Sequence, residues 1–244
     1  MSDSSVSQSQ AAAPNGADPV ALGRVAERAL GFVADGMTLG LGTGRAAEAF
    51  IRKLGERVAA GLGVRGVPTS VRSEALAREL GIPLATLDDV AELDVAVDGA
   101  DEVSPALDLT KGLGGALLRE RVVAAAARRF VVLVTPDKLV PCLGARTPIP
   151  IEIVPFALAP VSRALRALGA RPELRRRPDG TPFLSDNGQH IVDGHFGPIG
   201  DVRALDAALR RIPGVLDHGL FLAMASVVLV SEADGVRALE PPAR

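Results

Sequence analysis

MTLGLGTGRAAEAFIRKL, residues 37–54, decides the predicted fold of this chain. Its first five residues form a short apolar run of the kind found in buried strands. A glycine-rich turn follows, and from Arg45 to Leu54 the apolar residues recur at helical spacing. A strand that passes through such a turn into a helix is the repeating unit of a parallel α/β sheet.

The same alternation of strand and helix continues on both sides of this stretch, from Pro19 to about Arg146. Asp18 before Pro19 predicts a helix start, because aspartate caps helix N-termini and proline suits the first helical position. The pattern predicts an α/β fold whose parallel sheet is covered on both faces. The other expected elements are helices at residues 19–34, 72–80 and 115–129 and strands at 64–67, 93–97 and 130–134.

The pattern changes after Pro148, where strands and helices follow in a different order. The order βαββαβ is that of a small split-βαβ domain of ferredoxin type. Residues 226–230 are expected to form one more strand, which returns to the first sheet. The elements expected between them are strands at 151–154, 172–177, 182–193 and 215–222 and helices at 160–168 and 201–212.

The composition disfavours several classes of protein. Of the 244 residues, 48% are hydrophobic and 23% are charged, as in ordinary globular chains. The net charge of −2 provides no overall basic field for nucleic acid or an anionic membrane. The single cysteine, Cys142, cannot form an intrachain disulfide, and the three histidines lack metal-ligand spacing. Residues 1–18 are expected to be a disordered tail without signal-peptide features, and the protein is expected to be cytoplasmic.

The glycine-rich turn, Gly40–Arg45, has two interpretations. It binds an anion through exposed N–H groups and the helix dipole, or it is a tight turn without a ligand. Its order G-x-G-x-G differs from the G-x-G-x-x-G of dinucleotide sites, and residues 64–68 offer no acid for a ribose hydroxyl. There is no G-K-[ST] sequence either. A small phosphorylated molecule therefore fits better than NAD or ATP.

Three acids follow the strand predicted at 93–97, at the strand end where open parallel sheets place their sites. Asp98, Asp101 and Glu102 repel one another, so at least one is expected to pair with a cation or to have a shifted pKa. The same pattern fits helix-capping acids in a polar loop, or ligands of a magnesium ion.

Lys111 and a run of glycines stand directly before a predicted helix that carries Glu120. Taken alone, Glu120 between Arg119 and Arg121 fits a solvated helix face. Taken together with the glycine turn and the acids, these residues supply a base, a carrier of hydroxyl protons and a cation for an enediolate. That set is what proton abstraction next to a carbonyl group requires.

In its motifs the chain resembles the A-type ribose-5-phosphate isomerases over about residues 20–236. The resemblance implies a Rossmann-like parallel-sheet domain, residues 19–146 plus 223–244, with a ferredoxin-like α+β subdomain, residues 147–222. VDGADEV (97–103) combined with KGLGGALLRER (111–121) is its most specific part. The other shared motifs are GLGTG (40–44), GVPTS (66–70), DKLVPCLG (137–144), IPIEIVPF (149–156), SDNGQHIVD (185–193) and GLFLAMASVVLV (219–230).

The resemblance also implies an activity: interconversion of D-ribose 5-phosphate and D-ribulose 5-phosphate through an enediolate, in the pentose phosphate pathway, without a metal or other cofactor. Glu120 is expected to move a proton between C2 and C1, and Lys111 to stabilise the enediolate. Asp98 is expected to handle the hydroxyl proton and ring opening, and Asp101 to contact the substrate.

The binding of the phosphorylated pentose follows from the same resemblance. Thr43 is expected to hold the substrate, and Lys138 to lie near the phosphate. A homodimer or homotetramer is the expected assembly. The other expected contacts are Gly42, Gly44, Arg45, Gly112, Gly114 and Gly115.

Four residues depart from the usual pattern of the family. Arg45-Ala46 stands where Ser-Thr usually follows the glycine turn, and its guanidinium either grips a phosphate or points outward. Leu113 replaces a glycine, and Arg121 replaces a lysine. The alternatives to the isomerase are a related sugar-phosphate isomerase, deaminase or lactonase, a non-catalytic sugar-phosphate sensor and, more remotely, a metal-dependent phosphotransferase.

Overall fold

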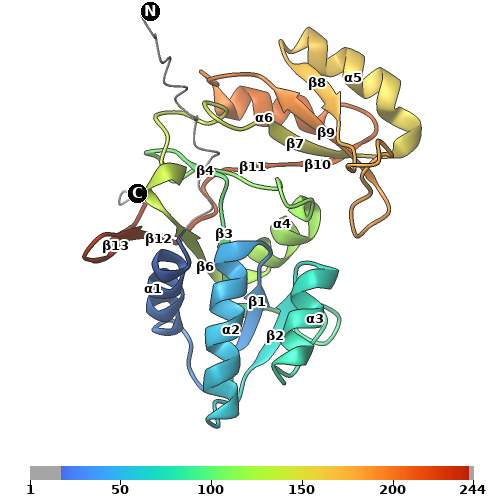
Figure 1. Cartoon of the computed structure of the whole chain (residues 1–244). Helices are drawn as coiled ribbons and strands as arrows, with labels where there is room; N and C mark the ends of the chain where they lie inside the picture. Colours follow the sequence, from blue (N-terminus) through green and yellow to red (C-terminus); the bar gives the residue numbers. More distant parts are fainter. Residues whose placement is uncertain (1–17, 242–244) are drawn as a thin grey trace, which may run out of the picture.

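A six-stranded sheet runs through the larger part of this computed structural model, which describes residues 18–241 (Figure 1). Its strand order is β13-β12-β6-β3-β1-β2, and all strands are parallel except β13, which is antiparallel to β12. The strands are β1 (Thr38–Leu41), β2 (Arg65–Pro68), β3 (Leu93–Gly99), β6 (Ala127–Val134), β12 (Val227–Glu232) and β13 (Gly235–Leu239).

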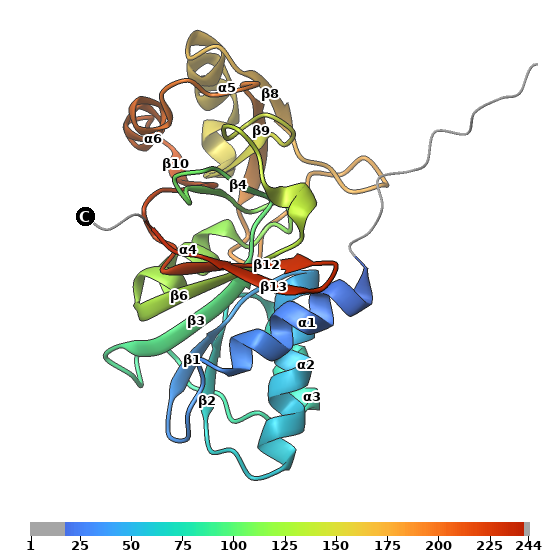
Figure 2. The same cartoon turned by 90° about the vertical axis from the view of Figure 1, so that its left-hand side faces the viewer.

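Apolar side chains alternate between the two faces of this sheet, as a strand period of two requires. Val95 and Val97 pack into one core, whereas Ala96 between them packs into the core on the other face. The first face is covered by α1 (Pro19–Leu30), α2 (Arg45–Ala59) and α3 (Val71–Glu79). The second is covered by α4 (Leu117–Ala125), which lies across the sheet from α1 and α2 (Figure 2).

A second sheet, of four antiparallel strands, forms the upper part of the molecule in Figure 1. Its order β10-β7-β9-β8 and its two helices match the βαββαβ arrangement of a ferredoxin-like fold. Ile149, Ile151 and Ile153 pack with both helices into its core. The elements are β7 (Ile149–Ile153), α5 (Leu158–Ala167), β8 (Arg171–Leu174), β9 (His190–His195), α6 (Val202–Arg210) and β10 (Val215–His218).

The fold class predicted from the sequence is confirmed: a parallel α/β sheet carries a smaller α+β unit. We propose the division into residues 19–146 plus 223–244 and residues 147–222 on this basis. Most of the tail expected at residues 1–18 lies outside the described residues.

A third sheet, of three very short strands, was not predicted. It consists of β4 (Glu102–Val103), β5 (Leu109–Thr110) and β11 (Leu220–Phe221), in the order β11-β5-β4. Strands of two residues are too short to show alternation, so the sequence gives no signal for them. This sheet joins the chain after β3 to the chain leaving β10, and so connects the two larger units.

Element bounds also differ from the predicted ones around α4. The helix expected at 115–129 ends at Ala125, and β6 already begins at Ala127. The first residues of the expected helix belong to a glycine loop, in which Gly112 and Gly115 have positive φ angles of 99° and 85°. The 3-10 turns Pro136–Lys138 and Pro155–Ala157 follow β6 and β7.

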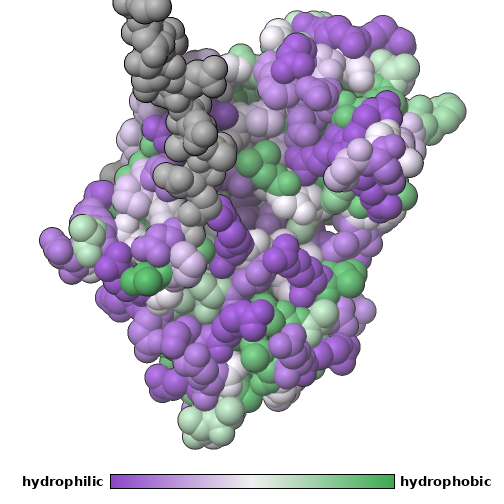
Figure 3. Space-filling model, viewed as in Figure 1, coloured by the Kyte–Doolittle hydropathy of each residue, from purple (hydrophilic) through white to green (hydrophobic). Residues whose placement is uncertain are grey.

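The molecular surface on the face of Figure 3 is mainly hydrophilic, with hydrophobic residues in small separate groups. No helix among residues 18–241 is both long enough and apolar enough to cross a bilayer.

Candidate active site

The candidate active site lies at the carboxyl ends of β1 and β3, which are adjacent parallel strands. Leu41 pairs with Val97, so the glycine turn after β1 and the acids at the end of β3 meet at one edge of the sheet. The contact is close, because a Cβ atom on Gly42 would lie 2.3 Å from Cγ of Asp98. Only glycine leaves room for the carboxylate here.

A cavity of about 140 Å³ opens at this edge. Three expected residues do not line it: Gly42, Asp98 and Gly115. The N–H groups of both glycines are already used, since Gly42 donates to Val97 (3.0 Å) and Gly115 donates to Gly112 (3.0 Å). Nine expected residues do line it, namely Thr43, Gly44, Arg45, Asp101, Lys111, Gly112, Gly114, Glu120 and Lys138.

Lys111 is the centre of the site. Its Nζ atom lies 3.0 Å from Oδ2 of Asp98 and 3.5 Å from Oε1 of Glu120, and it donates to the carbonyl oxygen of Gly99 at 2.7 Å. Lys111, Asp98 and Glu120 are 2%, 3% and 4% exposed. One ammonium group is therefore shared by two buried carboxyl groups, and at least one of these is expected to hold a proton.

Burial is the largest influence on the pKa values of these groups. It raises the pKa of Asp98 against the attraction of Lys111, and it raises the pKa of Glu120 to about 8. For Lys111, burial favours the neutral amine, but the charges of Asp98, Glu120 and Asp101 outweigh it and raise the pKa of the ammonium group. The site thus combines a permanently charged lysine with a glutamate that titrates near neutral pH.

The two carboxyl groups beside Lys111 differ in their hydrogen bonds. Oδ1 of Asp98 accepts hydrogen bonds from the N–H groups of Thr43 (3.1 Å) and Gly99 (2.7 Å). Oε2 of Glu120 is buried and has no hydrogen-bond partner among the described residues. Because N–H donors favour the charged form, the shared proton is expected on Glu120 and the negative charge on Asp98.

Asp101 and Glu102, the other two acids of the strand-end cluster, point in different directions. Asp101 lines the cavity, where its Oδ2 accepts the N–H of Leu113 at 3.0 Å, and burial raises its pKa. Glu102 is turned away and accepts N–H groups of Gly144 (2.6 Å), Arg146 (2.6 Å) and Thr147 (3.0 Å). The polar-loop interpretation is therefore correct for Glu102, which holds residues 144–147 in place.

A magnesium ion at this site would compete with the ammonium group of Lys111. The ammonium group of Lys111 occupies the space between Asp98 and Glu120 that a metal ion would need. Within residues 18–241 no three His, Cys, Asp or Glu side chains are grouped to hold a metal. Independence from metal stays a prediction.

A cluster of buried hydroxyl groups behind the glycine turn was missed in the sequence. Oγ1 of Thr43 lies 2.7 Å from Oγ1 of Thr69 and 2.8 Å from Oγ of Ser70. Ser73 extends the cluster to the carbonyl oxygen of Gly42 at 2.5 Å. The signal available was the GVPTS motif (66–70), whose serine is the N-cap of α3. These hydroxyl groups fix the side chain of Thr43 and hence the shape of the turn.

Two cations stand at the rim of the cavity. Arg45 is the first residue of α2, is exposed, and makes no hydrogen bond or ion pair with any other described residue. Lys138 lies in the 3-10 turn after β6, with its Nζ atom 3.9 Å from Asp137. Helix α2 has no side-chain cap, so its first N–H groups also face this region. The rim is suited to an anion such as a phosphate group.

Comparison with known proteins identifies the family of this chain. Residues 65–235 match the family model described as ribose 5-phosphate isomerase A (phosphoriboisomerase A). A protein of Roseiflexus castenholzii named ribose-5-phosphate isomerase A is 53% identical over 221 residues, which are 90% of this chain and 94% of that protein.

Solved structures are similar over the same range. A D-ribose-5-phosphate isomerase in complex with phospho-erythronic acid superposes with a TM-score of 0.88 at 42% identity, covering 91% of this chain and 98% of that one. The ribose 5-phosphate isomerase of Plasmodium falciparum has a TM-score of 0.88 at 34% identity, covering 93% and 100%. The chain belongs to the ribose 5-phosphate isomerase A family.

Proposed function

We propose that this enzyme interconverts D-ribose 5-phosphate and D-ribulose 5-phosphate by proton transfer at a buried glutamate. The observation that carries the proposal is the group formed by Glu120, Lys111 and Asp98 at the cavity. The carboxylate of Glu120 has an oxygen without a hydrogen bond, and an ammonium group lies beside it. A base next to a fixed cation is what the formation of an enediolate needs.

The chemistry balances with protein groups alone. Glu120 acts in its ionised form, of which a fraction is present near neutral pH because its pKa is about 8. In the open-chain aldose this carboxylate takes the proton from C2, and the electron pair moves through the carbonyl group to give an enediolate. Lys111 stabilises the negative charge on the two adjacent oxygens. Protonated Glu120 then returns the proton to C1 and forms the ketose. One hydroxyl proton must also pass from O2 to O1.

We assign that hydroxyl proton to Asp101, which lines the cavity, whereas the sequence suggested Asp98. Asp98 is covered and already bound to Lys111, Thr43 and Gly99. Its proposed role is to keep Lys111 charged and in place. Burial raises the pKa of Asp101, which suits a group that must accept and return a proton.

The phosphate group is assigned to the rim of the cavity. Gly44 and Arg45 at the start of α2 offer N–H groups, and Arg45 and Lys138 offer two positive charges. Thr43 lines the same edge, but its N–H is already donated to Asp98. The guanidinium of Arg45 has no partner within the described part of the chain, so it is available to a phosphate oxygen pair. Gly112 and Gly114 line the opposite loop of the cavity and are assigned to the sugar.

The ligand of a related protein supports the proposed substrate. The ligand named for it, phospho-erythronic acid, combines a phosphate with a carboxylic acid. A carboxylate spreads negative charge over two oxygens, as an enediolate does. The expected location in the cytoplasm and the expected homodimer or homotetramer stay predictions. A sensor without catalysis is disfavoured. Substrate binding alone does not explain why the buried Oε2 of Glu120 is left without a hydrogen-bond partner among the described residues.

The test is turnover of D-ribose 5-phosphate by the wild type and by Glu120→Gln, with a metal chelator present. We expect activity in the wild type and a loss of about 10²–10⁴-fold in the variant, since the amide cannot accept the proton. Glu79→Gln, an exposed glutamate on α3, is the matched control and should behave as wild type. Full activity of Glu120→Gln would refute the mechanism. No turnover of any pentose phosphate by the wild type would refute the function.

A further inference from the structure

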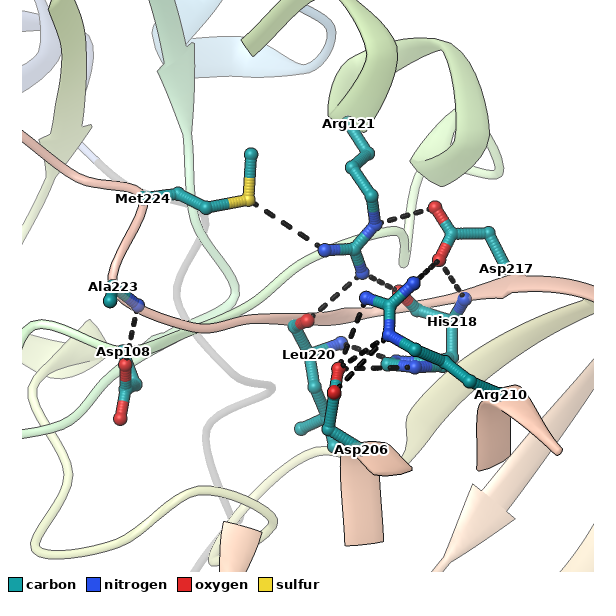
Figure 4. A network of polar contacts seen from close by, with 9 residues as sticks. All are labelled: Asp108, Arg121, Asp206, Arg210, Asp217, His218, Leu220, Ala223 and Met224. Atoms are coloured by element: carbon teal, nitrogen blue, oxygen red, sulfur yellow. Dashed lines mark hydrogen bonds and ion pairs between the residues drawn. The ribbon is translucent and has the colours of Figure 1, made fainter. Parts of the chain in front are cut away.

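Glu120 is flanked in the chain by two arginines, and both reach from α4 to the four-stranded unit. Nε of Arg121 lies 2.5 Å from Oδ2 of Asp217 in β10, and its Nη2 atom donates to the carbonyl oxygens of both His218 and Leu220, the latter at 2.9 Å (Figure 4). The guanidinium also lies 4.1 Å from the ring centre of Phe221. Arg121 therefore fastens α4 to residues 217–221.

Arg119 makes a second attachment on the other side of Glu120. Its Nε atom donates to Oδ1 of Asn187 at 2.8 Å, and a second nitrogen donates to the carbonyl oxygen of Asp186 at 2.9 Å. The loop that receives it is itself fixed, because Asn187 donates to Glu152 at 3.0 Å and Asp186 accepts the N–H of Val71 at 2.8 Å. Arg119 therefore fastens α4 to a firmly held loop.

Glu120 has little to hold it by itself. One of its carboxylate oxygens has no hydrogen-bond partner within residues 18–241, and the other lies 3.5 Å from Nζ of Lys111. Helix α4 has only nine residues and no side-chain cap at its start. A helix of this length is marginal without tertiary contacts. The direction of the carboxylate must therefore be set through the backbone of α4.

Successive side chains of an α-helix are rotated by about 100° about the helix axis. The side chains of Arg119 and Arg121 therefore project to opposite sides of the Glu120 side chain. With both side chains anchored, α4 cannot rotate about its axis. We propose that Arg119 and Arg121 are positioning residues, through which the four-stranded unit fixes the rotation of α4 and aims Glu120 at the substrate. This inference rests on the role of Glu120 proposed above.

The central experiment compares steady-state kinetics of Arg119→Gln, Arg121→Gln and Arg121→Lys with wild type, at a temperature where each is folded. We expect kcat to fall by about 10–100-fold in both Gln variants, since a small misplacement of a catalytic group has effects of this size. KM should stay unchanged, because the phosphate rim is untouched. Arg121→Lys should recover part of kcat, since it keeps the charge opposite Asp217 but loses the planar set of donors.

Arg128→Gln is the matched control, because Arg128 follows the end of α4 and pairs on the surface with Glu92, not with the four-stranded unit. If Arg121→Gln does not fold, the Arg119→Gln variant still tests the proposal. The partners of Arg119 are an amide and a carbonyl oxygen, so this substitution leaves no charge unpaired. A lower melting temperature with kcat unchanged in Arg119→Gln would reduce both arginines to a structural role and overturn the inference.

The pH profile gives an independent readout. Rotation of α4 should admit water to Glu120 and lower its pKa, so the rising limb of kcat/KM should move to lower pH in the arginine variants. The groups that face this carboxylate are Lys111, Asp98 and Asp101, and none is altered. An unmoved limb together with wild-type kcat would count against positioning. If Glu120→Gln is fully active, the proposed mechanism fails instead, whatever the arginine variants do.

Discussion

Two regions of this molecule bury carboxylates next to cations, and they differ in how completely the charges are satisfied. Around Arg121, the carboxylates of Asp217 and Asp206 meet Arg121 and Arg210, and Asp217 also accepts the N–H of His218 at 2.9 Å (Figure 4). Around Lys111, two carboxylates share one ammonium group, and one oxygen of Glu120 has no partner.

Both regions shift pKa values strongly, so a shift alone does not identify a catalytic group. Burial lowers the pKa of His218 to about 3, with help from the charge of Arg121, although His218 lies outside the cavity. Its Nδ1 atom accepts the N–H of Leu220 at 3.3 Å, whereas its Nε2 atom, 3.3 Å from Oδ1 of Asp206, makes no hydrogen bond with a described residue. The region around Lys111 differs because the residue with an unpartnered oxygen, Glu120, lines a cavity.

The largest effect is expected from removing the cation of the catalytic region. In Lys111→Met, Asp98 and Glu120 lose the one cation that pairs with them among residues 18–241, and the enediolate loses its stabilising ammonium. We expect kcat to fall by about 10²–10³-fold or more. Steady-state assays with D-ribose 5-phosphate check this, and Lys53→Met on the surface of α2 is the control. Activity within a few-fold of wild type would show that the cation is only structural.

The next effect separates the two aspartates. Asp101→Asn should lower kcat by about 10²-fold, because the amide cannot carry the hydroxyl proton. Asp98→Asn should lower kcat too, and it should also lower the pKa of Lys111, whose charge depends first on Asp98 among its acidic neighbours. A pH profile of each variant distinguishes them: only Asp98→Asn should lose activity at the alkaline end. The opposite pattern would return the hydroxyl proton to Asp98.

A smaller effect is expected at the rim of the cavity. Arg45→Ala removes a guanidinium without a protein partner, so the fold should be unaffected and only phosphate binding should suffer. A charge-assisted hydrogen bond contributes about 1.5–3 kcal/mol, which corresponds to a KM increase of about 10–100-fold. Competition by inorganic phosphate provides a second measurement. If KM is unchanged, Arg45 points away from the substrate, as one of the two interpretations of the sequence held.

The smallest effect concerns stability, and here the two regions should respond to pH in opposite directions. The pKa of His218 is lowered from 6.5 to about 3 on folding, so the unfolded chain binds the extra proton and stability falls as pH drops below about 6.5. The pKa of Glu120 is raised from 4.5 to about 8, so the folded chain binds the extra proton and stability falls as pH rises toward 8.

Chemical denaturation of His218→Asn and Glu120→Gln measures both directions. Asn keeps an acceptor near the position of Nδ1, so the variant should lose less stability between pH 7 and pH 5 than wild type does. Glu120→Gln mimics the protonated acid and should be more stable than wild type at pH 9. Effects on the order of 1 kcal/mol, or about 2–4 °C in Tm, are expected. His195→Asn, whose histidine is partly exposed, is the control. Parallel pH curves for all variants would contradict the comparison.

The fold was largely predictable, because most of its strands of four or more residues show apolar runs or alternation in the sequence. The strands missed were β4 and β5, which have two residues each, whereas β11 lies within the single strand expected at 215–222. The edge strand β13 (Gly235–Leu239) was missed as well, since its residues are exposed or only partly buried and form no buried apolar run. Length and burial thus decided which elements the sequence revealed.

The charged residues of the catalytic region were also predictable, because they lie in two short motifs that the sheet topology brings together. The contacts that hold these residues in place were not predictable. The contact of Arg121 with Asp217 joins residues far apart in the chain, and no spacing rule connects them. The hydroxyl cluster of Thr43, Thr69 and Ser70 depends likewise on the close packing of two turns. Sequence motifs identified reactive groups, whereas long-range packing determined their orientation.

The insertion of the four-stranded unit between β6 and β12 has a consequence for the order of folding. β12 pairs directly with β6, although residues 135–226 intervene between them. Bringing distant strands together costs chain entropy that grows with the length of the intervening loop. If that segment folds first, its compact ends shorten the loop that must close. The four-stranded unit should therefore gain protection from hydrogen exchange before β12 and β13 do, and the parallel sheet should be completed last.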